Sequence, residues 1–194
     1  MEFVLATFNR DKARELVPLL AEAGVILRTL ADFPGAVSPE ENGATLLDNA
    51  RLKARAALAH TGLPAVADDT GLEVDALDGA PGVHAARFAG SGARYEDNVR
   101  LLLARLQGVP DARRTARFRT VCVAAFPDGR EMIGEGTLEG RIRAAPRGSE
   151  GFGYDPVFEL PDGRTLAELS ADAKNAISHR SRAVRDLAAR LARA

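Results

Sequence analysis

Short apolar segments alternate with longer amphipathic ones in the first part of this chain, and this alternation constrains the fold most. Residues 3–6 and 25–27 are apolar runs of strand length. Between them, residues 11–23 place Leu16, Leu19 and Leu20 on one helical face, and Gly24 follows as a stop signal. Pro18 is expected to kink this helix or to delay its start. Strands that alternate with helices predict an α/β fold.

The next segments continue the pattern with clearer boundaries. Thr45 and Asp48 can form a capping box for a helix over residues 45–60, and Gly62 follows as its end. Residues 64–67 predict a buried strand that ends at Asp68 and Asp69. Residues 70–94 predict a long, irregular, glycine-rich connection, and long ordered loops of that kind are often functional.

The later part of the chain predicts a hairpin where the earlier part alternates strands with helices. A helix is expected over residues 95–106, and strands over 118–126 and 131–140 turn at Pro127-Asp128-Gly129. A short strand over 157–160 and a helix over 181–192 complete the pattern. These elements predict one domain over residues 1–194, of class α/β, with a mixed central β-sheet flanked by helices.

Composition limits the class of function. The 194 residues carry a net charge of −1, so no broad face for nucleic acid or membrane is expected. Cys122 is the one cysteine, which excludes an internal disulfide, and its apolar strand predicts a small core residue and not a nucleophile. The apolar run at residues 3–6 is too short for a signal peptide or a membrane span, so a cytoplasmic enzyme is expected.

Lysine is rare among the basic residues. Of the 26 lysines and arginines, only Lys12, Lys53 and Lys174 are lysine. A compact ammonium and a planar guanidinium are not equivalent at a tight phosphate site, so these positions are candidates for places where arginine cannot serve. The alternative is three leftover surface lysines.

Two acidic pairs, Glu40-Glu41 and Asp68-Asp69, are candidates for a metal site. The second pair follows an apolar strand, and ligands of α/β sheets gather at the carboxyl ends of strands. Adjacent carboxylates repel each other unless a cation or a proton lies near, and Mg²⁺ binds one or two carboxylates together with substrate phosphates. The alternative is that the two aspartates only begin a turn before Thr70-Gly71.

Other segments carry polar or aromatic side chains suited to a nucleotide. Residues 7–12 join the first strand to the N-terminus of the first helix, which favours phosphate, although an ordinary Asn cap explains Asn9 as well. Lys53 shares a helix face with Asn49, either in a site or in solvent. Residues 151–156 hold Phe152 and Tyr154 in a glycine-rich loop, which suits stacking on a base, while core packing is the commoner use of such residues.

Taken together, the segments resemble those of one enzyme family. In order, they are Thr7-x-Asn9-x-x-Lys12, Glu40-Glu41, Asp68-Asp69-Thr70-Gly71-Leu72, Gly79-x-Pro81-Gly82, Phe152-Gly153-Tyr154-Asp155-Pro156 and Ser178-His179-Arg180. The family is that of the inosine triphosphate pyrophosphatases, which act on non-standard purine nucleoside triphosphates. The likeness extends from residue 3 to the last helix, and Phe8 departs from the family's usual small residue.

The resemblance implies Mg²⁺-dependent hydrolysis of ITP, dITP or XTP to the nucleoside monophosphate and pyrophosphate. It also implies a homodimer and a two-lobed fold with the active cleft between the lobes. Asp69 would be the catalytic base and would hold the metal with Glu40, or with Glu41 as the alternative, and Asp68 would support the site. The phosphates would be held by Thr7, Phe8, Asn9, Arg10, Asp11 and Lys12, with Lys53. Other substrate contacts would come from Thr70, Phe152, Gly153, Tyr154, Asp155, Lys174, His179 and Arg180.

The base would be selected by hydrogen bonding. Donors from His179 or Arg180 aimed at position 6 would pair with a 6-oxo purine and leave the amino group of adenine unpaired. One alternative is a related pyrophosphatase that acts on modified pyrimidine or ordinary nucleoside triphosphates. Another is a nucleotide-binding module without turnover, which the acidic pairs and the three lysines disfavour.

Overall fold

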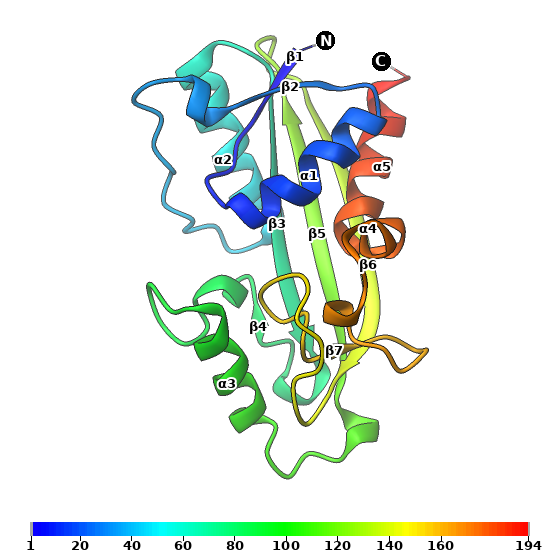
Figure 1. The fold of residues 1–194 in the computed structure, drawn as a ribbon. Coiled ribbons are helices and arrows are strands. Elements are labelled where there is room, and N and C mark those ends of the chain that lie inside the picture. Colours follow the sequence, from blue (N-terminus) through cyan, green and yellow to red (C-terminus); the bar gives the residue numbers. More distant parts are fainter. Residues whose placement is uncertain (1, 194) are drawn as a thin grey trace. The chain divides into compact units, whose positions relative to one another are not determined.

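The structure, a computed structural model, describes residues 2–193, which fall into two compact units. The first contains the residues up to Asp69, Thr120–Gly136 and the residues from Ser178 onward, and the second contains Thr70–Arg119 and Thr137–Ile177. The strand order is β2-β1-β3-β5-β6-β7, with β4 paired to β3 (Figure 1). Strands β3 (Ala65–Val74), β5 (Thr115–Ala125) and β6 (Glu131–Ile142) each contribute residues to both units.

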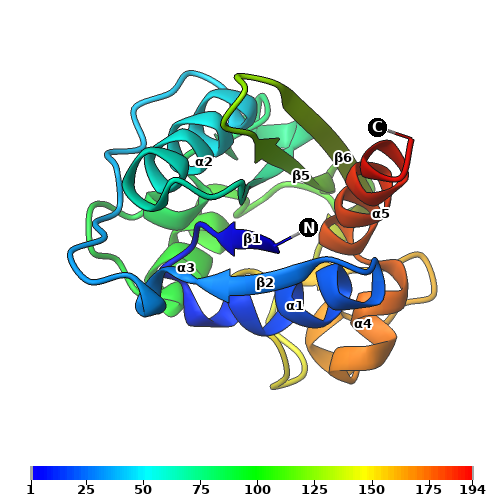
Figure 2. The same ribbon diagram turned by 90° about the horizontal axis from the view of Figure 1, so that it is seen from above.

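The first unit begins with two parallel strand pairs. Strand β1 (Glu2–Leu5) pairs with β2 (Ile26–Thr29) on one side and with β3 on the other. Helices α1 (Arg10–Glu22) and α5 (His179–Leu191) lie together beside these strands (Figure 2). They share one apolar cluster with the sheet, formed by Phe3, Leu5, Leu16, Leu19, Leu20, Val66, Cys122, Ala124, Phe126, Ala183, Val184 and Leu187.

Helix α2 (Leu46–Thr61) lies on the other side of β1 from α1 (Figure 2). Val4 and Ala65 are buried and alternate along their strands with members of the first cluster, so they face the opposite side of the sheet. The capping box of Thr45 and Asp48 is present, and Gly62 ends the helix in the left-handed conformation. Both predicted boundary signals of this helix are confirmed.

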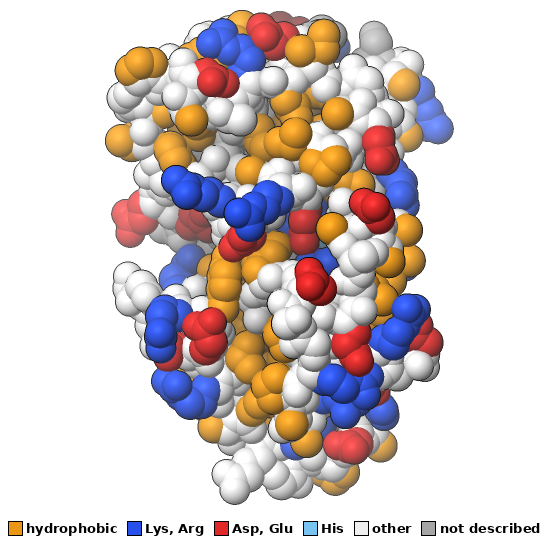
Figure 3. All heavy atoms as spheres, viewed as in Figure 1, with side chains coloured by type: hydrophobic (Ala, Val, Ile, Leu, Met, Phe, Trp, Pro, Cys, Tyr) orange, Lys and Arg blue, Asp and Glu red, His pale blue; other side chains and the backbone are white. Residues whose placement is uncertain are grey.

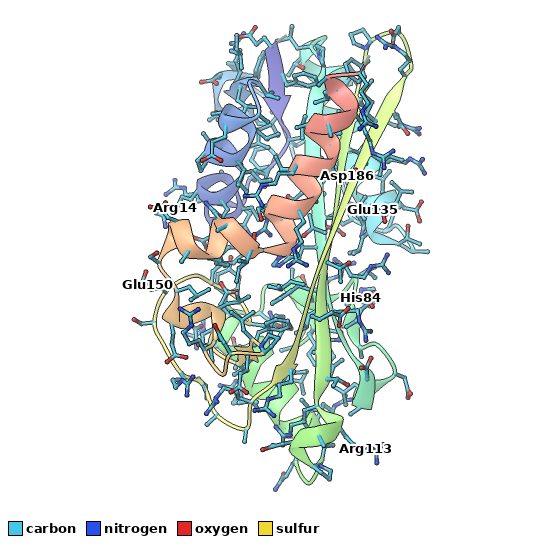
Figure 4. All side chains as sticks on the ribbon, turned by 90° about the vertical axis from the view of Figure 1, so that its right-hand side faces the viewer. Arg14, His84, Arg113, Glu135, Glu150 and Asp186 are labelled. Atoms are coloured by element: carbon cyan, nitrogen blue, oxygen red, sulfur yellow. The ribbon has the colours of Figure 1, made fainter. Side chains whose placement is uncertain are left out.

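Helix α5 packs unusually close to β6. A Cβ added at Gly134 or Gly136 would collide with the backbone of the helix at Ala183 or His179. The backbone N–H of Glu135 donates to the side chain of Asp186 at 3.1 Å, and Figure 4 shows the two residues on these neighbouring elements. Because these two glycines have no side chain, the N-terminal half of α5 can lie directly on the sheet.

The second unit is built around a separate core. Its helices are α3 (Tyr95–Arg105) and α4 (Ala171–Ile177), and its short strands are β4 (Pro81–Gly82) and β7 (Phe158–Glu159). Arg114 is buried and donates to the carbonyl oxygens of Leu106 and Val109, which satisfies backbone groups just after α3. The core contains Leu72, Val74, Val99, Leu102, Leu106, Phe118, Leu138, Ile142, Tyr154, Val157, Phe158 and Leu166. The 3-10 helices of the two units are η1 (Leu30–Asp32), η2 (Asp75–Leu77), η3 (Ala85–Arg87), η4 (Asp111–Arg113) and η5 (Leu166–Glu168).

The predicted α/β class with a mixed sheet flanked by helices is confirmed, with local corrections. Strand β3 runs through Asp68 and Asp69 to Val74, so the prediction of irregular chain from residue 70 is wrong for its first five residues. Pro18 lies inside α1, which begins at Arg10, so of the two outcomes expected of Pro18, a kink or a delayed start, the delayed start is wrong. Helix α4 was missed, and α5 begins two residues earlier than predicted. The prediction of a single domain stays a prediction.

On the face that Figure 3 shows, basic and acidic side chains are interspersed. None of the helices described between residues 2 and 193 combines the length and apolar character needed to cross a membrane.

Candidate active site

The segment between β1 and α1 is organised by Asn9. Its side-chain oxygen accepts hydrogen bonds from the backbone N–H groups of Asp11 (2.9 Å) and Lys12 (3.1 Å), as an N-cap does. The Asn9 N–H in turn donates to the Thr7 hydroxyl at 3.2 Å. The Asn-cap interpretation is therefore confirmed, and it leaves the hydroxyl of Thr7 and the ammonium of Lys12 at the N-terminus of a helix, where anions are favoured. Phe8 and Arg10 are exposed and Asp11 is half-buried.

Asp68 is the centre of a buried ion-pair network in the first unit. Its Oδ2 lies 3.2 Å from the Lys12 ammonium and 3.4 Å from Nε of Arg180. Arg180 also forms an ion pair with Glu15 of α1. Burial alone would raise the pKa of Asp68, but Lys12, Arg180 and Lys53 together hold that pKa well below its ordinary value. Asp68 is therefore ionised at neutral pH.

Asp69 lies in a second cluster with Lys53 and Asn49 of α2. The Lys53 ammonium is 2.8 Å from Oδ1 of Asp69, and the Asn49 amide donates to Oδ2 at 3.3 Å. The same ammonium is 3.3 Å from a carboxylate oxygen of Glu41. Burial opposes the charge on Lys53, but the attraction of Asp69, Asp68 and Glu41 outweighs it and raises the pKa of Lys53.

The structure distinguishes the two glutamates of the loop before α2. Glu41 contacts Lys53 beside Asp69, whereas Glu40 is exposed. The loop is tied to α2 because the N–H of Gly43 donates to the Asn49 side chain at 2.8 Å, and a Cβ at Gly43 would meet Asp48 and Asn49 within 2.7 Å. Of the two alternatives, Glu41 is the one that lies near Asp69.

Each of the three lysines is paired with a buried aspartate. Lys12 lies beside Asp68, Lys53 beside Asp69, and Lys174 beside Asp155 in the second unit. Their side chains are 16%, 9% and 5% exposed, in that order, so the alternative of leftover surface lysines is wrong.

In the second unit, the glycine-rich loop is held by Asp155. Its Oδ2 accepts from the Phe152 N–H at 2.8 Å and from the Lys174 ammonium. The ammonium lies 4.9 Å from the centre of the Phe152 ring, which also packs against Tyr95 at 5.7 Å between ring centres. Lys174 and Phe152 therefore come together, and Gly153 lies in the same turn and adopts a positive φ.

The remaining predicted site residues are buried or half-buried. Of the two alternatives for the loop aromatics, core packing holds for Tyr154, which is buried and donates to the carbonyl oxygen of Ala85 at 2.9 Å. His179 and Arg180 are buried at the first turn of α5, behind Ser178, whose hydroxyl caps the helix. Thr70 is half-buried in β3. A direct contact of Arg180 with a base stays a prediction, and its contacts with Asp68 and Glu15 favour a supporting role.

The geometry can be compared with known proteins. A model of the Ham1 family matches residues 3–190, so the match includes every candidate site residue described above. This chain belongs to the Ham1 family. It is 54% identical to a dITP/XTP pyrophosphatase of Symbiobacterium thermophilum over 93% of this chain and 90% of that protein. It is 51% identical to the dITP/XTP pyrophosphatase of Thioalkalivibrio sulfidiphilus over 98% of both chains.

Solved Ham1 structures show the same fold. The structure of a HAM1 protein from Coxiella burnetii matches with a TM-score of 0.90 and 40% identity over the whole of both chains. The structure of a nucleoside-triphosphatase, or dITP/XTP pyrophosphatase, from Mycobacterium abscessus matches with a TM-score of 0.78 and 46% identity, covering 95% of this chain and 97% of that one.

The sequence interpretation missed one polar residue of this site, Glu15, and left the setting of a second, Asn49, open. Glu15 follows Lys12 by three residues, which places both on one face of α1, but nothing local indicates that its partner is Arg180. Asn49 was recognised as sharing a face with Lys53, and solvent explained that face equally well. Its contacts with both Gly43 and Asp69 show that the face is internal.

Gly151 in the Ham1 loop offers a test of the Asp155 anchor. Gly151 and Gly153 both have positive φ, but a Cβ at Gly151 would collide with the Asp155 carboxylate while a Cβ at Gly153 would meet open space. Gly153→Ala is expected to cost about 1–2 kcal/mol from the backbone alone. Gly151→Ala is expected to cost more, because Asp155 must also move away from Lys174. Urea unfolding of both variants measures the free energy of unfolding. Equal losses in the two variants would show that the contact of Asp155 with Lys174 contributes nothing to stability.

Proposed function

We propose that this chain hydrolyses non-standard purine nucleoside triphosphates, namely ITP, dITP and XTP, to the monophosphate and pyrophosphate with Mg²⁺. Membership of the Ham1 family and the pyrophosphatase relatives support the reaction class. The observation that carries the proposal is the cluster of buried Asp69 and Lys53 with half-buried Glu41, which sets a carboxylate base beside a cation and a second carboxylate. Hydrolysis of a phosphoanhydride needs charge neutralisation and a base for water.

The donor set of the first unit fits a divalent cation. The carboxylates of Glu41 and Asp69 each place an oxygen beside the same Lys53 ammonium, so both lie where a cation is favoured. Within residues 2–193, no group of three or more His, Cys, Asp or Glu side chains is arranged to hold a metal, so the remaining ligands must be water and substrate oxygens, as is usual for Mg²⁺. When bound, Mg²⁺ would neutralise phosphate charge and acidify a nearby water.

Phosphate binding, proton transfer and positioning are carried out by different residues of the chain. Thr7, the first turn of α1 and Lys12 bind phosphate oxygens, aided by Lys53. Water attacks the α-phosphorus, the bond from that phosphorus to the α,β-bridging oxygen breaks, and pyrophosphate leaves. Asp69 takes the proton of the attacking water on a carboxylate oxygen. Asp68 acts indirectly, because it holds Lys12 beside the helix N-terminus.

The second unit contains groups that suit a purine base. Phe152 offers an aromatic face, and Lys174 is a cation held by Asp155 beside it. A donor such as the Lys174 ammonium favours the 6-oxo group of hypoxanthine or xanthine over the 6-amino group of adenine.

We also propose that the protein acts as a homodimer in the cytoplasm. Light scattering tests the oligomeric state, and cell fractionation tests the location.

One assay tests the activity. Pyrophosphate release is measured for ITP, XTP, dITP, GTP, ATP and dTTP, with Mg²⁺ and with a chelator. The expected result is Mg²⁺-dependent release, with kcat/KM for ITP and XTP at least ~100-fold above that for ATP, the discrimination that unpaired buried polar groups provide. Comparable rates for dTTP would favour the pyrimidine alternative, and binding without release would favour a regulatory module.

The two glutamates give a sharper prediction about the metal. Glu41→Gln is expected to raise the Mg²⁺ concentration for half-maximal turnover by about 10-fold or more, since even indirect partners of metals are worth that much. Glu40→Gln is expected to change it little, because Glu40 is exposed and Glu41 is the residue beside Asp69. Magnesium titrations of ITP turnover measure both. A larger effect at Glu40 would restore the first alternative from the sequence.

A further inference from the structure

We propose that the Lys53 ammonium serves as the internal counter-ion of Asp69 and Glu41 whenever no metal is bound, and that it keeps a divalent cation from these carboxylates until a nucleotide phosphate draws the ammonium away. The inference deepens the proposed function and rests on it in one respect, the use of these two carboxylates by the metal. It predicts that metal and nucleotide bind together and that the metal binds weakly alone.

The position of the ammonium carries the argument. Nζ of Lys53 lies 2.8 Å from Oδ1 of Asp69 and 3.3 Å from Oε1 of Glu41, so one ammonium contacts an oxygen of each carboxylate. A magnesium ion sits about 2.0–2.1 Å from its ligand oxygens and would have to lie close to this ammonium. Cation and ammonium repel each other strongly at such separations in a buried setting.

The other groups around Asp69 also oppose the binding of a metal to its carboxylate. The second oxygen of Asp69 accepts a hydrogen bond from the Asn49 amide at 3.3 Å, so both oxygens already have donors. Lys53 is only 9% exposed on its side chain, and solvent therefore screens its charge little. Neighbouring Asp68 is matched by Lys12 and Arg180, so it offers the cation no additional unpaired charge.

A nucleotide phosphate can draw the Lys53 ammonium away from the two carboxylates by movement of the side chain, without movement of the backbone. The lysine stem is long and flexible, and its ammonium is a point charge that binds phosphate from many directions. When a phosphate oxygen attracts it, the two carboxylates lose their counter-ion at the moment the phosphates bring further oxygen ligands for the metal. A bare cation brings no such compensation.

The test is metal affinity without nucleotide, measured with Mn²⁺ by electron paramagnetic resonance on the full chain. Wild type is expected to bind Mn²⁺ weakly. Lys53→Met and Lys53→Gln are each expected to bind it at least ~10-fold more tightly, since removal of a unit charge at this range shifts even proton affinity by 1–3 pKa units. Arg143→Met is the matched control, because it removes a cation from a different buried carboxylate, that of Glu159, and should leave Mn²⁺ affinity unchanged.

The outcomes separate this inference from the proposed function. If folded Lys53→Met and Lys53→Gln bind Mn²⁺ no more tightly than wild type, the counter-ion role is overturned whether or not ITP is hydrolysed. If both bind more tightly and the added Glu41→Gln substitution removes the gain, the role is supported even if ITP is not a substrate. Circular dichroism of each variant confirms that folded protein is compared, and the more polar Gln variant keeps the test available if Met disturbs the fold.

Discussion

Asp69→Asn is expected to lower the turnover number for ITP at least ~100-fold while the protein stays folded. The substitution keeps an oxygen that can accept from Lys53 or Asn49, the two groups that contact the Asp69 carboxylate. It removes the negative charge that would bind the metal and the basicity that would take a proton from water. Chemistry should therefore suffer much more than structure.

Steady-state kinetics at saturating ITP and Mg²⁺ measure the effect, and thermal unfolding shows whether the variant is folded. The matched control is Asp75→Asn, because Asp75 also pairs with a basic residue, Arg117, but lies exposed in the second unit and outside the proposed machinery. The control should retain wild-type turnover. An Asp69→Asn protein that keeps more than a tenth of wild-type turnover would remove Asp69 from its proposed role.

Features that depend on neighbouring residues were predictable from the sequence. The capping box at Thr45 and the left-handed Gly62 set the ends of α2 locally, and the structure places them as expected. The rarity of lysine was informative for a different reason. Each of the three ammonium groups is paired with a buried aspartate, and a compact ammonium and a planar guanidinium are not equivalent in such a place.

Features that depend on distant residues were not predictable. Glu15 and Arg180 lie 165 residues apart, and only the packing of α1 against α5 brings them together. The extension of β3 beyond Asp69 is set by its pairing with β4 and by the burial of Leu72 and Val74, which no local pattern around Asp68-Asp69 reveals. The burial of Tyr154 likewise follows from a partner, the carbonyl of Ala85, on a distant segment.

The largest stability effect is expected at Asp68. Asp68→Ala is expected to lower the free energy of unfolding by about 3–5 kcal/mol, the usual cost of removing one partner from a buried ion pair. Arg180 would keep Glu15, but its Nε and the Lys12 ammonium would lose the carboxylate that now lies between them. Urea unfolding at pH 7 measures the loss. Asp75→Ala, which removes an exposed carboxylate, should cost much less because solvent screens such pairs.

The same network predicts how the loss depends on pH. Burial would raise the pKa of Asp68 in the folded protein, but Lys12, Arg180 and Lys53 outweigh burial and lower that pKa. The ionised Asp68 therefore stabilises the folded state fully above the ordinary aspartate pKa of about 3.9. Below that pH the unfolded chain takes up the proton first, and the stabilisation declines as the solution becomes more acidic. The gap between wild type and Asp68→Ala should therefore be constant from pH 7 to about pH 5 and should narrow by pH 3. A gap that stays constant to pH 3 would mean that packing, and not the charge of Asp68, accounts for the loss.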